Sequence, residues 1–140
     1  MRAITFPYGL YRGLPSPLIP VQFRGPRDWK EVWVYVDSGA FLSILAEAEA
    51  RLLGLTLEEG KLTYSIVGDG SLIPVYIHEL SIRIGPSEVR ARIGFSPRLG
   101  VGFNLLGRQD IFTAFDVTFS DFRRQVIFAP VGKKSHSSGA

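Results

Sequence analysis

Asp37 is the residue whose setting best fits a catalytic role. It follows the apolar run VWVYV and precedes Ser38, Gly39 and Ala40. An unpaired carboxylate in apolar surroundings is costly, so it either becomes neutral or acquires partners. The Ser-Gly-Ala turn is tight enough to aim backbone N–H groups at the carboxylate. Asp37 is therefore our candidate for carboxylate chemistry, in which such a group accepts or donates a proton.

Other kinds of catalytic site lack the residues they need. The sequence has no cysteine and two histidines, and His78 lies within the alternating segment VYIHELSI, where a histidine is more often structural than catalytic. One usable histidine without a thiolate is a poor metal-ligand set. The GDGS segment at 68–71 lacks the Gly-Lys-Ser/Thr ending of a phosphate-binding loop and precedes a strand. We therefore expect neither a metal nor a cofactor.

The remaining carboxylates have ordinary interpretations as solvated groups. They lie in turns, on or beside a helical segment, or between strand residues, and Asp110 and Asp116 fit a surface charge and a strand-edge residue. Asp-Ser-Gly alone also occurs in ordinary β-turns. The elements around Asp37 must therefore decide its interpretation.

These elements are mostly short strands. Residues 17–25 and 30–36 are β-rich and flank the turn GPRD, which predicts a hairpin ending at Asp37. A longer hairpin is predicted around the glycines of GDGS, where positive φ is allowed. SEVRARIGF follows as a neighbouring strand. FDVTF and QVIFAP flank SDFRR as a last hairpin.

Only two segments have a helical pattern. AEAEARLLGL contains strong helix formers, with Ala48, Leu52 and Leu53 on one side and Gly54 at the C-terminal cap. GRQDIFTAF allows one or two turns. Many strands and few helices predict a single, mostly-β domain with a closed barrel or sandwich. We expect an N-terminal extension over 1–16, the domain over 17–131 and a disordered tail or expression remnant over 132–140.

Composition and charge exclude other classes of protein. Of 140 residues, 46% are hydrophobic and 21% charged, which favours a packed globule. Lys133 and Lys134 supply two of the three net positive charges, so residues 1–131 carry +1, which is too little for the strong positive potential typical of nucleic-acid-binding proteins. No membrane span and no signal peptide is recognisable, and we expect a cytoplasmic protein.

Three segments together resemble the retroviral-type aspartic proteases, the retropepsins. VWVYVDSGAFLSILAEAEARLLGL is similar to the active-site strand, loop and helix of that family. YSIVGDGSLIPVYI resembles its flap, a glycine-tipped hairpin that covers substrate. FNLLGRQDIFTAFDVTF is similar to a further element of the family, which has the pattern hydrophobic-hydrophobic-Gly-Arg-Asp/Asn/Gln. In that element a strand passes into a short helix packed beneath the active-site loop. The resemblance spans about residues 17–129.

The resemblance implies a role for each of these segments. It makes Asp37 catalytic, Ser38 a brace between two loops across a two-fold axis, Gly39 a point of close backbone approach and Ala40 a small spacer. The implied flap tip consists of Val67, Gly68, Asp69, Gly70 and Ser71. The implied supporting element consists of Leu105, Leu106, Gly107 and Arg108.

The resemblance also implies a homodimer, because one chain has one Asp-Ser-Gly whereas the chemistry needs two carboxylates around one water. The expected partners are a second copy of the chain and a peptide or protein substrate. The chain departs from viral members at Phe41, where they usually carry an acidic residue. It also departs at its ends, since viral dimers interleave their termini whereas this chain has a long N-terminal piece and a polar tail.

Two alternatives remain. The first is a catalytically silent module of the same fold that dimerises or binds peptides. The second is a small β-barrel that binds nucleic acid through arginines and aromatic side chains, although alternating arginine and apolar residues occur in any half-exposed strand. Its candidate residues are Arg90, Arg92, Arg98, Arg108, Arg123, Arg124, Phe95, Phe103, Phe122 and Phe128.

Overall fold

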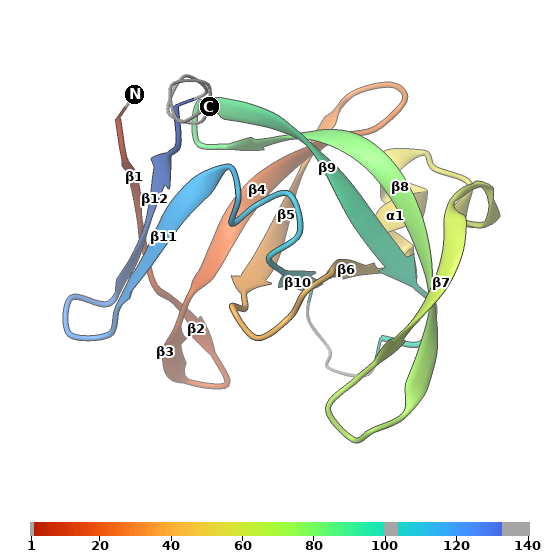
Figure 1. Cartoon of the computed structure of the whole chain (residues 1–140), viewed down its shortest axis with the longest axis horizontal. Coiled ribbons are helices and arrows are strands. Elements are labelled where there is room, and N and C mark those ends of the chain that lie inside the picture. Colours follow the sequence, from red (N-terminus) through yellow and green to blue (C-terminus); the bar gives the residue numbers. More distant parts are fainter. Residues whose placement is uncertain (1, 100–103, 133–140) are drawn as a thin grey trace, which may run out of the picture.

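The protein is almost entirely built of β-strands, as a computed structural model shows for residues 2–99 and 104–132 (Figure 1). The regular elements are β1 (Ile4–Pro7), β2 (Gly9–Tyr11), β3 (Leu14–Ser16), β4 (Leu18–Arg24), β5 (Trp29–Val36), β6 (Ser43–Ala46), α1 (Glu47–Leu53), a 3₁₀ turn η1 (Leu57–Glu59), β7 (Lys61–Ile66), β8 (Leu72–Ile84), β9 (Ser87–Ser96), β10 (Asn104–Leu106), β11 (Phe115–Ser120) and β12 (Gln125–Pro130). The mostly-β fold class expected from the sequence is confirmed.

The main sheet closes on itself. Its seven strands follow the order β4-β5-β10-β6-β9-β8-β7, and β4 also pairs with β8 through Gln22 with Arg83 and Phe23 with Ile82. The predicted hairpins β4–β5 and β7–β8 are present and antiparallel, and the strand expected beside the second hairpin is β9, which pairs antiparallel with β8. Closure leaves fewer free strand edges, which a small β-protein must otherwise protect.

Two parallel pairings bring distant segments to the end of β5. β10 runs parallel to β5, with Leu106 opposite Val36, and β6 runs parallel to β9. β10 also pairs with β6 through Leu105 and Ile44. The segment after β5 and the segment after β10 therefore leave the sheet side by side.

Strand alternation fills the main core. In β8, Leu80, Ile82 and Ile84 are buried, whereas Glu79, Ser81 and Arg83 on the opposite face are not. A second, smaller cluster consists of Ile44 on β6 with Ile73 and Val75, which lie in the part of β8 that pairs with β7.

A separate three-stranded sheet has the order β1-β12-β11. The predicted hairpin β11–β12 is present, and Ile4–Pro7 pairs antiparallel with Gln125–Phe128. Part of the expected N-terminal extension thus pairs with a strand of the body, while the expected domain boundaries stay a prediction. Of the expected tail, residues 133–140 lie outside the described part of the chain.

Helix α1 forms where helix formers follow β6, and it ends at Gly54, whose φ of 79° is the left-handed cap expected from the sequence. The three residues expected on one side of this helix, Ala48, Leu52 and Leu53, do not share one environment. Ala50 and Leu53 face the core, whereas Leu52 is 67% exposed and Ala48 is also exposed. The helix has only two turns, so the strands around it rather than its own apolar stripe decide which residues are covered.

The segment 108–114 forms consecutive turns rather than a helix. Phe112 N and Phe115 N donate to Arg108 O and Ile111 O, at 2.9 and 3.0 Å. This agrees with the one or two turns expected there. The short helix implied by the family resemblance is absent from this segment.

Candidate active site

The loop after β5 wraps its backbone around the Asp37 carboxylate. Gly39 N donates to Asp37 Oδ1 at 2.8 Å, and Ala40 N donates to Asp37 O at 3.2 Å. Asp37 N donates to Leu106 O at 3.0 Å, which ties the loop to the end of β10. The carboxylate is half-buried and accepts the backbone hydrogen bond that the tight Ser-Gly-Ala turn predicts.

Gly39 lies close to the Asp37 carboxylate, and Ser38 faces solvent. A Cβ atom at position 39 would lie 3.2 Å from Asp37 Oδ1, tighter than most van der Waals contacts, so glycine permits the close approach. Ser38 is exposed, and within residues 2–99 and 104–132 its hydroxyl has no hydrogen-bond partner. The role expected for Ser38 across a two-fold axis stays a prediction.

The supporting element lies directly against the active-site loop. Leu106 is fully buried, and Gly107 N donates to the buried Ser43 Oγ at 2.9 Å. Arg108 N and Gln109 N donate to the carbonyl oxygens of Ala40 and Phe41, at 2.9 and 2.8 Å. Three successive N–H groups thus hold the segment that follows Asp37.

Gly107 has no space for a side chain. A Cβ atom there would collide with the carbonyl group of Leu42 and would lie 2.8 Å from Ala40 O. These are backbone atoms of the active-site loop, which cannot move aside without shifting Asp37. The expected placement of Leu105–Arg108 next to Asp37 is observed.

The β7–β8 hairpin projects freely beyond the barrel (Figure 1). At its tip, Val67 N donates to Ser71 O at 3.0 Å and Gly70 adopts a φ of 84°. Asp69 Oδ1 accepts hydrogen bonds from Ser71 N at 2.9 Å and Ser71 Oγ at 2.6 Å. The hydroxyl bond is the main reason that the pKa of Asp69 is lowered.

The flap tip and the active-site loop enclose one cleft. Its volume is about 550 Å³, and Asp37 is its only ionisable lining residue in the part of the chain that the structure describes. Its lining is Asp37, Gly39, Ala40, Phe41, Leu42, Ile44, Ser65, Ile66, Val67, Gly68 and Leu105. The cleft brings together members of all three segments that the sequence singled out. The expected site residues that are not part of this lining are Ser38, Asp69, Gly70, Ser71, Leu106, Gly107 and Arg108.

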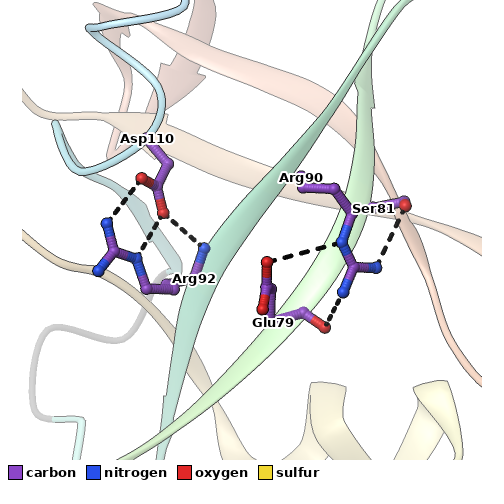
Figure 2. Close-up of polar contacts among 5 residues, drawn as sticks. All are labelled: Glu79, Ser81, Arg90, Arg92 and Asp110. Atoms are coloured by element: carbon purple, nitrogen blue, oxygen red, sulfur yellow. Dashed lines mark hydrogen bonds and ion pairs between the residues drawn. The ribbon is translucent and has the colours of Figure 1, made fainter.

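A second polar cluster braces the chain after Gly107 (Figure 2). Arg92, on β9, donates its backbone N, its Nε and its Nη2 to the carboxylate of Asp110, each at 2.9 Å. The bonds from Arg92 lower the pKa of Asp110, and the same bonds raise the pKa of Arg92. Beside this pair, Arg90 lies 3.8 Å from the Glu79 carboxylate. Asp110, expected from the sequence to be a surface charge, is partly exposed and is paired with Arg92.

Two supporting residues of the site escape sequence reasoning. Ser43 accepts the hydrogen bond from Gly107, and Asn104 accepts one from Ala46 N at 2.9 Å while its amide nitrogen lies 3.2 Å from Glu49 Oε2. Ser43 is 64 positions from Gly107 in the sequence, and Asn104 is 58 positions from Ala46. No local pattern signals such contacts.

The described residues contain no group of three or more His, Cys, Asp or Glu side chains that could hold a metal ion. None of the helices in the described ranges has the length and apolarity needed to cross a membrane.

Comparison with solved structures identifies the fold. A retropepsin-like aspartic protease from Rickettsia conorii aligns with a TM-score of 0.65 and 19% identity over 91% of each chain. The retroviral protease-like domain of Ddi1 from Leishmania major aligns with a TM-score of 0.59 and 12% identity, over 86% of this chain and 97% of that one. EIAV protease, complexed with the inhibitor HBY-793, aligns with a TM-score of 0.52 and 20% identity, over 71% of this chain and 88% of that one. No family model and no curated protein sequence matches the chain.

The chain therefore has the fold of the retropepsin-like aspartic proteases, as the resemblance predicted. All three likenesses extend over most of the known structure, so the fold is present nearly in full. At these identities, the chemistry must be argued from the residues of the site.

Proposed function

We propose that this protein is an aspartic endopeptidase that hydrolyses extended peptide segments as a symmetric homodimer. The observation that carries the proposal is the position of Asp37: its carboxylate accepts the Gly39 N–H and lines a cleft that the flap tip also lines. A structural carboxylate has no need of a cleft or of a glycine-tipped cover.

The dimer follows from the number of carboxylates. Asp37 is the one acidic group among the described residues that line the cleft, whereas water activation in this class of chemistry uses two. A two-fold axis beside the loop supplies the second Asp37 from another copy of the chain. The exposed Ser38 hydroxyl, which has no partner among the described residues, is available for the same contact.

In such a dimer, the two carboxylates hold one proton between them, because both ionise only at high cost when they are adjacent. The ionised carboxylate takes a proton from the bound water as the water oxygen attacks the scissile carbonyl carbon. The protonated carboxylate donates a hydrogen bond to the carbonyl oxygen, and a proton then passes to the leaving amine nitrogen. No covalent enzyme intermediate forms.

The cleft suits an extended peptide. Its walls are mostly apolar side chains, including Leu42, Ile44, Ile66 and Val67, with the flap backbone above. A peptide strand bound there alternates its side chains between the two walls, while its backbone offers hydrogen bonds to the flap. Flap closure over the peptide excludes water from the reacting centre.

Cleavage of a denatured protein or a peptide library, compared between the wild type and Asp37→Asn, tests the proposal. We expect Asp37→Asn to lower kcat by about 10²–10⁴-fold, because it removes the group that accepts the proton. The matched control is Asp28→Asn, which alters a carboxylate in the β4–β5 turn at the other end of β5. Wild-type protein without activity between about pH 3 and pH 8 would instead favour the silent dimerisation or peptide-binding module.

The shared proton also predicts a bell-shaped dependence of kcat/KM on pH in the acidic to neutral range. Activity falls at low pH because both carboxylates are protonated, and at high pH because both are ionised. A statine-type transition-state mimic is expected to inhibit. A metal chelator is expected to have no effect. The cytoplasmic location expected from the sequence stays a prediction.

A further inference from the structure

A second cavity adjoins the proposed catalytic cleft at Phe41. Its volume is about 350 Å³, and Phe41 lines both spaces. Phe41 is 55% exposed, so part of its side chain is open to a ligand. The lining of this cavity is Phe41, Arg92, Arg108, Gln109, Asp110, Phe112 and Thr113.

Two of the three charged groups in this cavity neutralise each other. Arg92 places both Nε and Nη2 at 2.9 Å from Asp110 oxygens, and Figure 2 shows the fork directly. Because Arg92 bonds lower the pKa of Asp110, this carboxylate stays ionised and committed to its partner. Asp110 is therefore not available to Arg108.

The third charge, Arg108, has no carboxylate partner in the described part of the chain. Its guanidinium carbon lies 5.7 Å from the centre of the Phe41 ring, and within residues 2–99 and 104–132 no acidic side chain forms an ion pair with it. Its backbone is nevertheless fixed, since Arg108 N donates to Ala40 O and Arg108 O accepts from Phe112 N. An exposed, positively charged group thus stands on a rigid base beside the catalytic loop.

We propose that Arg108 and Phe41 form an outer subsite that binds an acidic side chain of the peptide substrate. A guanidinium accepts a carboxylate through two parallel hydrogen bonds, and its contact with an aromatic face restricts its orientation beforehand. The aliphatic part of a Glu side chain packs on the exposed Phe41 ring. This inference rests on the proposed function, because it assumes a peptide that occupies the cleft.

Paired peptides that differ only by Glu against Gln test this subsite. The substitution is placed at each position about two to four residues from the scissile bond, which is the reach of a strand running past Phe41. We expect one position at which the Glu peptide has a kcat/KM about fivefold higher at low salt, with a smaller ratio at high salt. In Arg108→Gln the ratio falls to about one.

Arg27→Gln provides the matched control. It removes the same charge from an exposed position in the β4–β5 turn, at the far end of β5 from Asp37. The Glu/Gln ratio is expected to keep its wild-type value in this variant. Thermal unfolding of each variant verifies that the fold is intact.

The subsite and the proposed function fail in different ways. Cleavage without any Glu preference, or a preference that persists in Arg108→Gln, overturns the subsite and leaves the proteolytic activity standing. A lower dimer affinity in Arg108→Gln with an unchanged ratio assigns Arg108 to the subunit contact and also overturns it. If no peptide is cleaved, binding of the same Glu and Gln peptides to the Asp37→Asn protein is measured by titration. Tighter binding of the Glu peptide, lost when Arg108→Gln is added, supports the subsite alone. Equal binding of the two peptides, or no binding, overturns it.

Discussion

Gly107 shows how strictly single residues control the position of Asp37. Any side chain at this position collides with the backbone of Leu42 and approaches Ala40 O to 2.8 Å. The N–H of Gly107 also satisfies the buried Ser43 hydroxyl. The active-site loop and the supporting element can therefore approach only because residue 107 lacks a Cβ atom.

We expect Gly107→Ala to lower the free energy of unfolding by about 1–3 kcal/mol, as overpacking of a close contact does. Denaturant unfolding measures this change. Gly68→Ala is the matched control, because a Cβ atom at position 68 meets no atom within 4 Å. Equal effects of the two substitutions would contradict the packing argument.

The ion pair of Asp110 with Arg92 predicts how the stability of the fold depends on pH. The pKa of Asp110 is lowered in the folded protein, chiefly by the hydrogen bond from Arg92. The stability that the ionised Asp110 contributes is therefore present above the pKa of this group in the unfolded chain, and it is lost as the pH falls through the pKa in the folded protein. We expect Asp110→Asn to have a lower Tm than the wild type at neutral pH. Asn also tolerates the positive φ of 66° at this position.

The difference in Tm between Asp110→Asn and the wild type is expected to shrink at pH values below the ordinary carboxyl pKa. Thermal unfolding followed by circular dichroism over a series of pH values measures it. A difference that stays constant down to strongly acidic pH would assign the effect to packing instead of ionisation.

Local signals predict local structure. The turn after Asp37 and the glycine-tipped hairpin are predictable because each is specified within a few residues, whereas the catalytic role of Asp37 stays a prediction. The contacts of Ser43, Asn104 and the Arg92–Asp110 pair are not predictable, since their partners lie 18 to 64 positions away and meet only through the closed sheet. The different exposure of Leu52 and Leu53 could not be predicted either, because a two-turn helix presents no clear buried stripe.

Among the elements, the flap depends on a turn held by one carboxylate. Asp69 accepts both the backbone N–H and the hydroxyl of Ser71, while Gly70 takes the left-handed conformation. The hairpin strands themselves expose apolar side chains such as Ile66 and Leu72. The tip is therefore ordered by local hydrogen bonds more than by packing.

We expect Asp69→Ala to raise the mobility of the flap tip and to raise KM, because a disordered tip loses more conformational entropy when it closes on a peptide. Amide hydrogen exchange at residues 67–71 measures the mobility. Asp121→Ala, in the turn between β11 and β12, is the matched control. Unchanged exchange at the tip would show that Asp69 does not order it.

For the whole molecule, the proposed dimer needs a surface, and exposed apolar side chains suggest where it lies. Leu10 and Leu14, on the β2–β3 hairpin, and Phe122, in the β11–β12 turn, are between 67% and 94% exposed. In Figure 1 these two hairpins project toward the same lower side as the flap tip, whereas α1 lies at the right of the barrel. Apolar groups on one side favour association there.

We expect Phe122→Ser to weaken the dimer by at least about tenfold, as the loss of a buried aromatic side chain predicts. Sedimentation velocity over a range of concentrations measures the affinity. Leu52→Ser, which removes an exposed apolar side chain on α1, is expected to leave the affinity unchanged. A dimer of unchanged affinity in Phe122→Ser would move the interface elsewhere.

Mixing wild-type and Asp37→Asn subunits tests the central claim most directly. If one active site uses Asp37 from both copies, only wild-type pairs cleave peptide, and an equal mixture at constant total protein keeps about one quarter of the activity. If each chain works with its own Asp37 alone, the mixture keeps about one half. A quadratic dependence of activity on the wild-type fraction is the predicted result, and a linear dependence would contradict the account.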